Sequence, residues 1–120
     1  LVLRGGSRGP NFSAEHIHAA AGLLRQSNLP SGIMVDCSHA NSGKDPTRQP
    51  AVAAAIAAQI AGGERSIAAT MIESNLLGGA QDFQARPLVP GRSITDACLG
   101  WEDTLPMLDV LAEAVRARRG

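Results

Sequence analysis

Three short runs of apolar residues constrain the fold of this chain more than any other feature of its sequence. They occupy residues 1–3, 33–35 and 67–72, and none of them alternates apolar with polar side chains. Runs of this length without alternation are typical of strands that are covered on both faces, as strands are in parallel sheets. The sequence therefore predicts three parallel strands in an α/β protein.

Helical patterns follow the first two predicted strands. Ser13 is a suitable N-cap for a helix over residues 14–27, which ends before Pro30. A second helix is predicted from Pro50, a residue that favours the first helical turn, to the Gly62-Gly63 pair, which favours a helix end. Each of these strands thus leads through a helix to the next strand, as parallel pairing requires.

A long loop and a last helix complete the predicted arrangement. Residues 74–93 contain several glycines and prolines without a helix or strand period, and loops of this length are commonly functional or disordered. Asp103 or Thr104 can cap the helix that follows. Its predicted buried stripe consists of Leu108, Leu111, Ala112 and Val115. With 120 residues, against about 250 for a complete eight-fold α/β barrel, the chain fits part of a barrel or part of an open doubly wound sheet.

The charge balance and the cysteine count exclude several classes of protein. Basic and acidic residues both number 11, so nothing calls for nucleic acid or an anionic membrane surface as a partner. Cys37 and Cys98 form neither a disulfide framework nor a CxxC pair, which favours a reducing, cytoplasmic location. The most apolar stretch, residues 51–61, is too short to span a bilayer. We therefore expect no nucleic-acid and no membrane partner.

Charged and polar side chains follow each predicted strand. Arg4 follows the first strand, Asp36 and His39 the second and Glu73 the third, while Asp96 lies after the long loop. In α/β barrels the carboxyl ends of the strands open onto one face, so these side chains are expected to converge. His39, Glu73 and Asp96 would offer one imidazole and two carboxylates, a donor set that suits a divalent metal such as Mn, Fe, Co or Zn.

Each of these residues also has a structural interpretation. A histidine such as His39 in a Ser-His-Ala-Asn turn often caps or packs, and Asp96 can cap a helical turn. Glu73 directly after an apolar strand is either paired or functional. Arg4, beside two glycines, suits a phosphate or carboxylate ligand, but it can equally form a salt bridge to Asp36 on the neighbouring strand. Spacing alone does not decide between these alternatives.

Several segments, in order along the chain, resemble one enzyme family. They are LRGG at residues 3–6, DCSHANS at 36–42, QIAGGE at 59–64, IES at 72–74, and SITDAC at 93–98 with GWEDT at 100–104. Together they resemble the type I 3-deoxy-D-arabino-heptulosonate 7-phosphate (DAHP) synthases, which are sensitive to aromatic amino acids. A series of motifs in the same order is far more specific than any one of them.

The resemblance implies a fold and a metal site. The family has a (β/α)8 TIM-barrel fold, so residues 1–120 would be the carboxy-terminal part of a single synthase domain, comprising the last three βα units of the barrel. His39, Glu73 and Asp96 would be three of four metal ligands. The fourth ligand of the family is an upstream cysteine, whose segment has no counterpart in this sequence.

The resemblance also implies roles toward substrates. Arg4 falls on the family arginine that contacts phosphoenolpyruvate, and Lys44, in the same loop as His39, is a candidate for phosphate binding. Arg4 and His39 would be the catalytic residues of this segment, and Arg4, His39, Asp96 and Lys44 would contact substrate.

The implied reaction is the metal-dependent, aldol-type condensation of phosphoenolpyruvate with D-erythrose 4-phosphate. It yields 3-deoxy-D-arabino-heptulosonate 7-phosphate and phosphate, the first step of the shikimate pathway, so the chain would be part of a transferase. Because the family's other basic substrate-binding residues lie upstream, we expect the isolated chain to be inactive. The alternative is an inert structural fragment without activity of its own. A partial barrel leaves both sheet edges open, so self-association into a homo-oligomer is expected in either case.

Overall fold

The computed structural model describes residues 1–120 and contains a three-stranded parallel sheet. Its strands are β1 (Val2–Leu3), β2 (Ile33–Asp36) and β3 (Ile67–Met71), in the order β1-β2-β3. The register pairs Leu3 with Val35 and Asp36 with Met71, so all three strands end at the same edge of the sheet. The predicted α/β class and the parallel pairing are confirmed.

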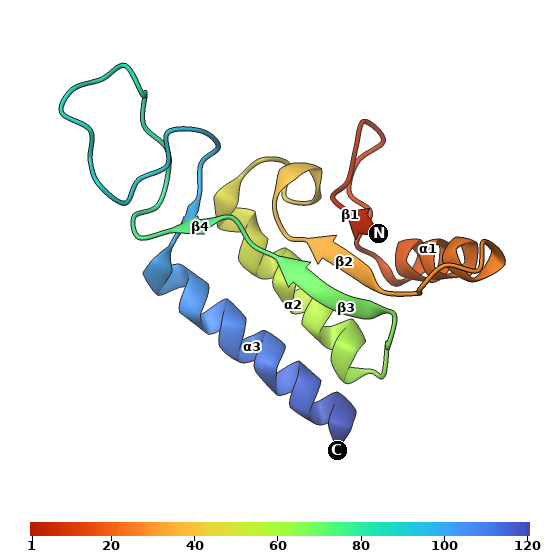
Figure 1. The fold of residues 1–120 in the computed structure, drawn as a ribbon. Coiled ribbons are helices and arrows are strands. Elements are labelled where there is room, and N and C mark those ends of the chain that lie inside the picture. Colours follow the sequence, from red (N-terminus) through yellow and green to blue (C-terminus); the bar gives the residue numbers. More distant parts are fainter.

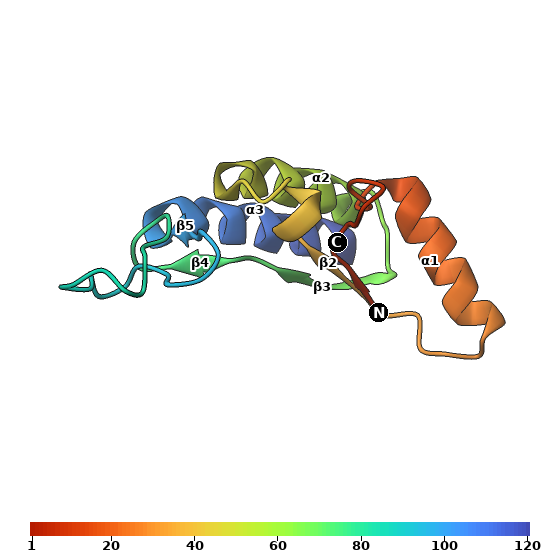
Figure 2. The same ribbon diagram turned by 90° about the horizontal axis from the view of Figure 1, so that it is seen from above.

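Three helices connect and cover the strands. They are α1 (Ala14–Gln26), α2 (Gln49–Ala61) and α3 (Trp101–Arg119), and the first two end within one or two residues of the predicted positions. Two 3-10 turns, His39–Asn41 and Pro46–Arg48, lie between β2 and α2. Helices α2 and α3 lie on one face of the sheet, and α1 runs beside β1 and β2 (Figures 1 and 2). This arrangement leaves the carboxyl ends of the strands uncovered by helices.

Helix α2 occupies the centre of the core. It is apolar on nearly all sides, as expected of a helix packed on a sheet and beside another helix. Val52, Ile56 and Ile60 recur at four-residue intervals and are at most 4% exposed, and Ile56 is fully buried. Burial of these aliphatic side chains supplies much of the free energy that holds the strands in place.

The start of the last helix differs from the prediction. Helix α3 begins at Trp101 with Gly100 as its N-cap, two residues before Asp103. Thr104 does not cap the helix, because its Oγ1 donates to the Gly100 carbonyl oxygen at 2.8 Å and lies 2.7 Å from Ser74 Oγ. The cap prediction was wrong because the helix begins at Trp101, so Asp103 and Thr104 both lie inside it.

The buried stripe of α3 is also rotated relative to the prediction. Its buried residues are Thr104, Met107 and Ala114, whereas Leu108 is 43% exposed. Among the predicted residues, Leu111 and Val115 pack against the core while remaining partly exposed. The buried Thr104 also contacts Ser74, a long-range contact that a count of leucines along the sequence does not reveal.

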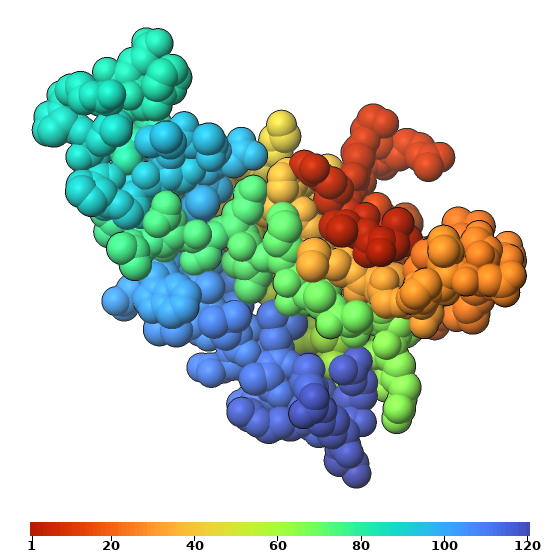
Figure 3. All heavy atoms as spheres, in the orientation of Figure 1, coloured from red at the N-terminus to blue at the C-terminus, as the bar shows by residue number.

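The long loop contains more structure than predicted. Strand β4 (Ser74–Asn75) pairs in parallel with β5 (Leu99–Gly100), and between them the chain forms a lobe that stands out from the body of the molecule (Figures 1 and 3). The Gln81 side chain stabilises this lobe, which we define as residues 76–94. Its Nε2 donates to the carbonyl oxygens of Val89 and Arg92, and its Oε1 accepts from Val89 N.

The sheet has two open edges. Strands β1 and β3 each pair only with β2, so these three strands do not close into a barrel. Membership of a larger barrel therefore stays a prediction.

None of the helices combines the length and the apolarity that a membrane span requires.

Candidate metal centre

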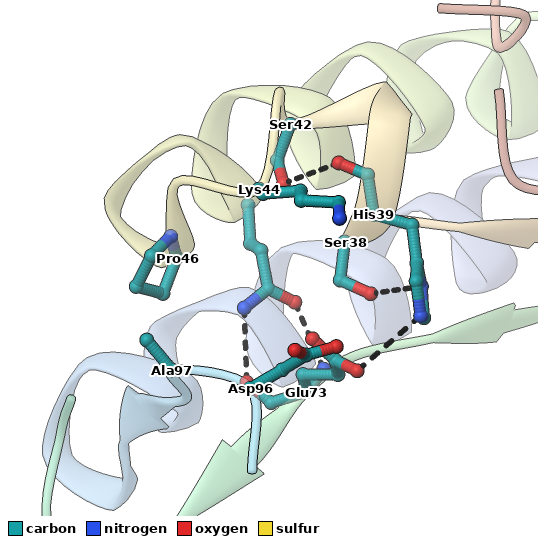
Figure 4. Close-up of a pocket in the computed structure, with 9 residues that line it drawn as sticks. Ser38, His39, Ser42, Lys44, Pro46, Glu73, Asp96 and Ala97 are labelled. Carbon is teal, nitrogen blue, oxygen red and sulfur yellow. Dashed lines mark hydrogen bonds and ion pairs between the residues drawn. The ribbon is translucent and has the colours of Figure 1, made fainter. Parts of the chain in front are cut away.

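A small pocket opens where β2 and β3 end. Its lining residues come from the loop after β2, the start of α2, the end of β3 and the segment before β5: Ser38, His39, Ser42, Lys44, Pro46, Gln49, Glu73, Asp96 and Ala97 (Figure 4). Its volume is about 50 Å³. Pockets for organic ligands typically measure about 300–1,000 Å³, so this one suits an ion with its water better than a whole substrate.

His39, Glu73 and Asp96 converge in this pocket. Each can offer one ligand atom such that all three atoms lie within 4.8 Å of one another. His39 Nε2 lies 3.6 Å from Glu73 Oε1, and the Asp96 carboxylate lies next to that of Glu73 (Figure 4). His39 and Glu73 are partly buried, while Asp96 is exposed. The sequence prediction that these three side chains meet at the carboxyl ends of the strands matches this arrangement.

Buried Asp36 orients the imidazole of His39. The Asp36 side chain is 1% exposed, and its Oδ2 lies 2.7 Å from His39 Nδ1. Its Oδ1 accepts from both the backbone N–H and the hydroxyl of Ser38. A carboxylate that accepts from Nδ1–H leaves the lone pair of Nε2 free toward the pocket, which is how metal-binding histidines are usually held.

The backbone at His39 is also unusual. His39 has φ +50°, in the left-handed region that residues other than glycine seldom adopt. Its carbonyl oxygen accepts from Lys44 N at 2.7 Å, and Lys44 itself has φ +63°. Sparsely populated backbone conformations of this kind cluster at functional sites.

The donor set and its spacing fit a divalent cation. Ligand atoms at about 2.1 Å from one metal are about 3–4 Å apart, which small side-chain movements would achieve here. One imidazole with two carboxylates suits Mn, Fe, Co or Zn better than a metal that prefers thiolates. Neither cysteine belongs to the convergent group.

The structural alternatives for these residues can now be compared with the contacts. No hydrogen bond to the Asp96 carboxylate is present, so Asp96 does not cap a helical turn. Asp36 pairs with His39 rather than with Arg4, and Arg4 forms no ion pair. Glu73 is paired, but its partner His39 is itself a candidate ligand.

The two basic candidates occupy different places. Lys44 is exposed and lines the pocket (Figure 4). Arg4 is also exposed and follows β1, but it does not line this pocket. Its neighbour Gly5 packs against the His39 loop so closely that a Cβ there would lie 2.8 Å from Ala40 Cβ. The chain segment that carries Arg4 therefore lies against the loop that carries His39.

Sequence reasoning did not single out Gln49 as part of the site. Gln49 is fully buried, lines the pocket and is the first residue of α2. The one available indication was a polar residue directly before Pro50, at the start of a helix whose remaining residues are apolar except for Gln59.

The two cysteines should differ sharply in reactivity. Cys37 is fully buried, and burial, together with the adjacent Asp36 carboxylate, raises the pKa of its thiol to about 12. Cys98 is half-buried. We expect N-ethylmaleimide at pH 7.5 to add once to the native protein, at Cys98, and twice after denaturation, since only a thiolate reacts readily. Intact-mass spectrometry measures this, and rapid double labelling of native protein would contradict the burial of Cys37.

Known proteins resemble this chain along almost its whole length. The family model that matches is that of the DAHP synthetase I family, over residues 1–109. A tyrosine-inhibited phospho-2-dehydro-3-deoxyheptonate aldolase of Schizosaccharomyces pombe is 54% identical over 124 residues, covering 99% of this chain and 33% of that protein. The Phe-sensitive enzyme of Escherichia coli is 49% identical over 121 residues, covering 100% of this chain and 34% of that protein.

The fold is matched as well. The solved structure of a phospho-2-dehydro-3-deoxyheptonate aldolase from Francisella tularensis superposes with a TM-score of 0.95 at 47% identity, covering 99% of this chain and 35% of that chain. This chain therefore spans about a third of the length of the relatives it matches.

Proposed function

The chain belongs to the DAHP synthetase I family, and from this premise we propose that it supplies the metal-binding end of a DAHP synthase. The observation that carries the proposal is the convergence of His39, Glu73 and Asp96 within 4.8 Å at the carboxyl ends of the strands. The orientation of His39 by buried Asp36 supports it. The relatives are DAHP synthases, which perform the first step of aromatic amino acid biosynthesis.

The proposed reaction joins phosphoenolpyruvate to D-erythrose 4-phosphate. C3 of phosphoenolpyruvate attacks the aldehyde carbon, water adds at C2, and phosphate leaves by cleavage of its C–O bond. His39, Glu73 and Asp96 would hold a divalent cation, which would supply a Lewis acid for the aldehyde oxygen as negative charge develops there. The two carboxylates offset the charge of the cation, and the imidazole completes its ligands from this chain.

The basic side chains would hold the anionic substrates. Arg4 offers a planar fork that can bind the carboxylate or phosphate of phosphoenolpyruvate with two hydrogen bonds. Lys44, at the pocket, offers a compact charge for a phosphate group. Holding two anions together in a fixed orientation lowers the entropic part of the barrier. Both roles rest on the family resemblance. Lys44 lines the pocket, whereas Arg4 lies in a segment that packs against the His39 loop.

Mn²⁺ binding and a coupled assay test the proposal together. We expect the 12.4 kDa chain to bind Mn²⁺, as measured from the loss of the free-ion signal in electron paramagnetic resonance. We also expect no phosphate release from phosphoenolpyruvate and erythrose 4-phosphate by this chain alone. Absence of Mn²⁺ binding would overturn the metal site, and Mn²⁺-dependent turnover would overturn the proposed inactivity.

The second candidate is a self-associating structural fragment, which the open edges of β1 and β3 favour. Sedimentation velocity separates the two candidates when combined with the Mn²⁺ measurement, because an inert fragment would associate without binding metal. The cytoplasmic location and the homo-oligomeric state stay predictions.

A further inference from the structure

The side-chain amide of buried Gln49 forms two hydrogen bonds with the backbone of Glu73. Gln49 Nε2 donates to the Glu73 carbonyl oxygen, and Glu73 N–H donates to Gln49 Oε1, each at 2.9 Å. The orientation of the amide is fixed by these partners, since one is only a donor and the other only an acceptor. Gln49 is 0% exposed, so water does not compete for either bond.

This pair of bonds replaces strand pairing where β3 ends. The ladder between β2 and β3 stops at Asp36 and Met71, two residues before Glu73. Beyond that point the Gln49 side chain gives Glu73 the donor and the acceptor that a neighbouring strand would otherwise provide. The Glu73 carbonyl oxygen also accepts from Leu99 N at 2.9 Å. The Glu73 backbone is therefore held from two directions.

The same contacts connect the segments that carry the three candidate ligands. Gln49 follows the loop that begins at His39, and that loop is closed by the bond from Lys44 N to the His39 carbonyl oxygen. Leu99 lies three residues after Asp96. The peptide groups of Glu73 thus bond to the His39 side of the pocket through Gln49 and to the Asp96 side through Leu99.

We propose that Gln49 is a positioning residue that fixes the Glu73 carboxylate at the distance from His39 and Asp96 that a divalent cation requires. The inference rests on the metal site of the proposed function. Its physical basis is entropic. A ligand whose backbone is free to shift must be ordered when the metal binds, and the conformational entropy lost in that step lowers the affinity. Loss of a residue that orients a metal ligand typically weakens affinity by about 10–100-fold.

Two substitutions remove the bonds in different ways. Gln49→Met keeps the length and most of the volume but offers neither donor nor acceptor. Gln49→Asn keeps both polar groups but is one methylene shorter and cannot reach the Glu73 backbone on both sides. The matched control is Gln59→Met, in the same helix. Gln59 Nε2 donates to the Phe12 carbonyl oxygen at 2.9 Å, away from the pocket.

The first measurement is Mn²⁺ affinity of the 120-residue chain, with the free energy of unfolding of each variant measured beside it. We expect both Gln49 variants to bind Mn²⁺ about 10–100-fold more weakly than the parent. Gln59→Met, whose measured stability is compared in the same way, should keep the parent affinity. Equal loss of affinity in Gln59→Met, or a Gln49→Met variant that is folded and binds within twofold of the parent, would overturn the inference.

The second measurement does not depend on metal. Amide hydrogen exchange at Glu73 should be at least about tenfold faster in Gln49→Met than in the parent, because the N–H loses its acceptor. It should be unchanged in Gln59→Met. Unchanged protection in Gln49→Met would overturn the inference even if Mn²⁺ affinity fell. Failure of the parent chain to bind Mn²⁺ would instead overturn the proposed metal site and, with it, the role of the Gln49 bonds in metal binding.

Discussion

Replacing Glu73 by glutamine is expected to weaken Mn²⁺ binding by more than 100-fold. Glu73 lies 3.6 Å from His39 Nε2 and supplies one of the two carboxylates of the candidate site. Glutamine has the same shape but carries no charge, so a dication would lose one of its two anionic ligands. Loss of a ligand should therefore exceed the roughly 10–100-fold effect of losing a residue that only orients one. Titration with Mn²⁺ by calorimetry or paramagnetic resonance measures the change.

The control for this substitution is Glu113→Gln. Glu113 is an exposed residue of α3, so the variant has the same change in net charge without a change in the pocket. It should bind Mn²⁺ like the parent. If both variants lost affinity equally, the effect would come from the overall charge of the chain, and Glu73 would not be a ligand.

Replacing Ile56 by alanine is expected to destabilise the fold by about 2–5 kcal/mol. Ile56 is 0% exposed and lies in α2, the helix packed on the sheet beside α3. Its truncation leaves a cavity that the helix backbone cannot fill. Single domains are stable by only about 5–15 kcal/mol, so this loss is a large share of the total. Urea unfolding followed by circular dichroism at 222 nm gives the difference.

Leu108→Ala supplies the comparison on a neighbouring helix. Leu108 is 43% exposed in α3, so its truncation should cost about 1 kcal/mol or less. A similar cost for the two substitutions would mean that α2 is not the centre of the core. The variants together therefore test the packing that holds β2 and β3, and with them His39 and Glu73.

The elements that the sequence predicted well are those with strong local signals. Apolar runs without alternation indicated the three strands, and the Ser13 and Pro50 signals indicated the starts of the first two helices. The rule that parallel strands end at one edge placed His39 and Glu73 together. Asp96 follows the long loop rather than a strand of this sheet, so its place beside them was expected from a loop that folds back and from the family resemblance.

What the sequence did not predict depends on contacts between distant segments. The Gln49–Glu73 bonds join residues 24 positions apart, and no local pattern marks such a pair. The Ser74–Thr104 contact beside the start of α3 likewise joins residues 30 positions apart. Strands β4 and β5 have two residues each, too few for any periodicity to appear.

The lobe after β4 has a consequence for how such a protein can change in evolution. Gly79 pairs with Cys98 after the pocket segment and Ala80 pairs with Ser93 before it, so the lobe is joined at its base on either side of that segment. Residues near its tip, such as Gln84, are exposed and far along the chain from that junction. Insertions or deletions at the tip change only a surface loop, whose closure entropy grows slowly with length. Related sequences can therefore vary in length here, and a reporter peptide can be grafted here, while the path that brings Asp96 to the pocket stays the same.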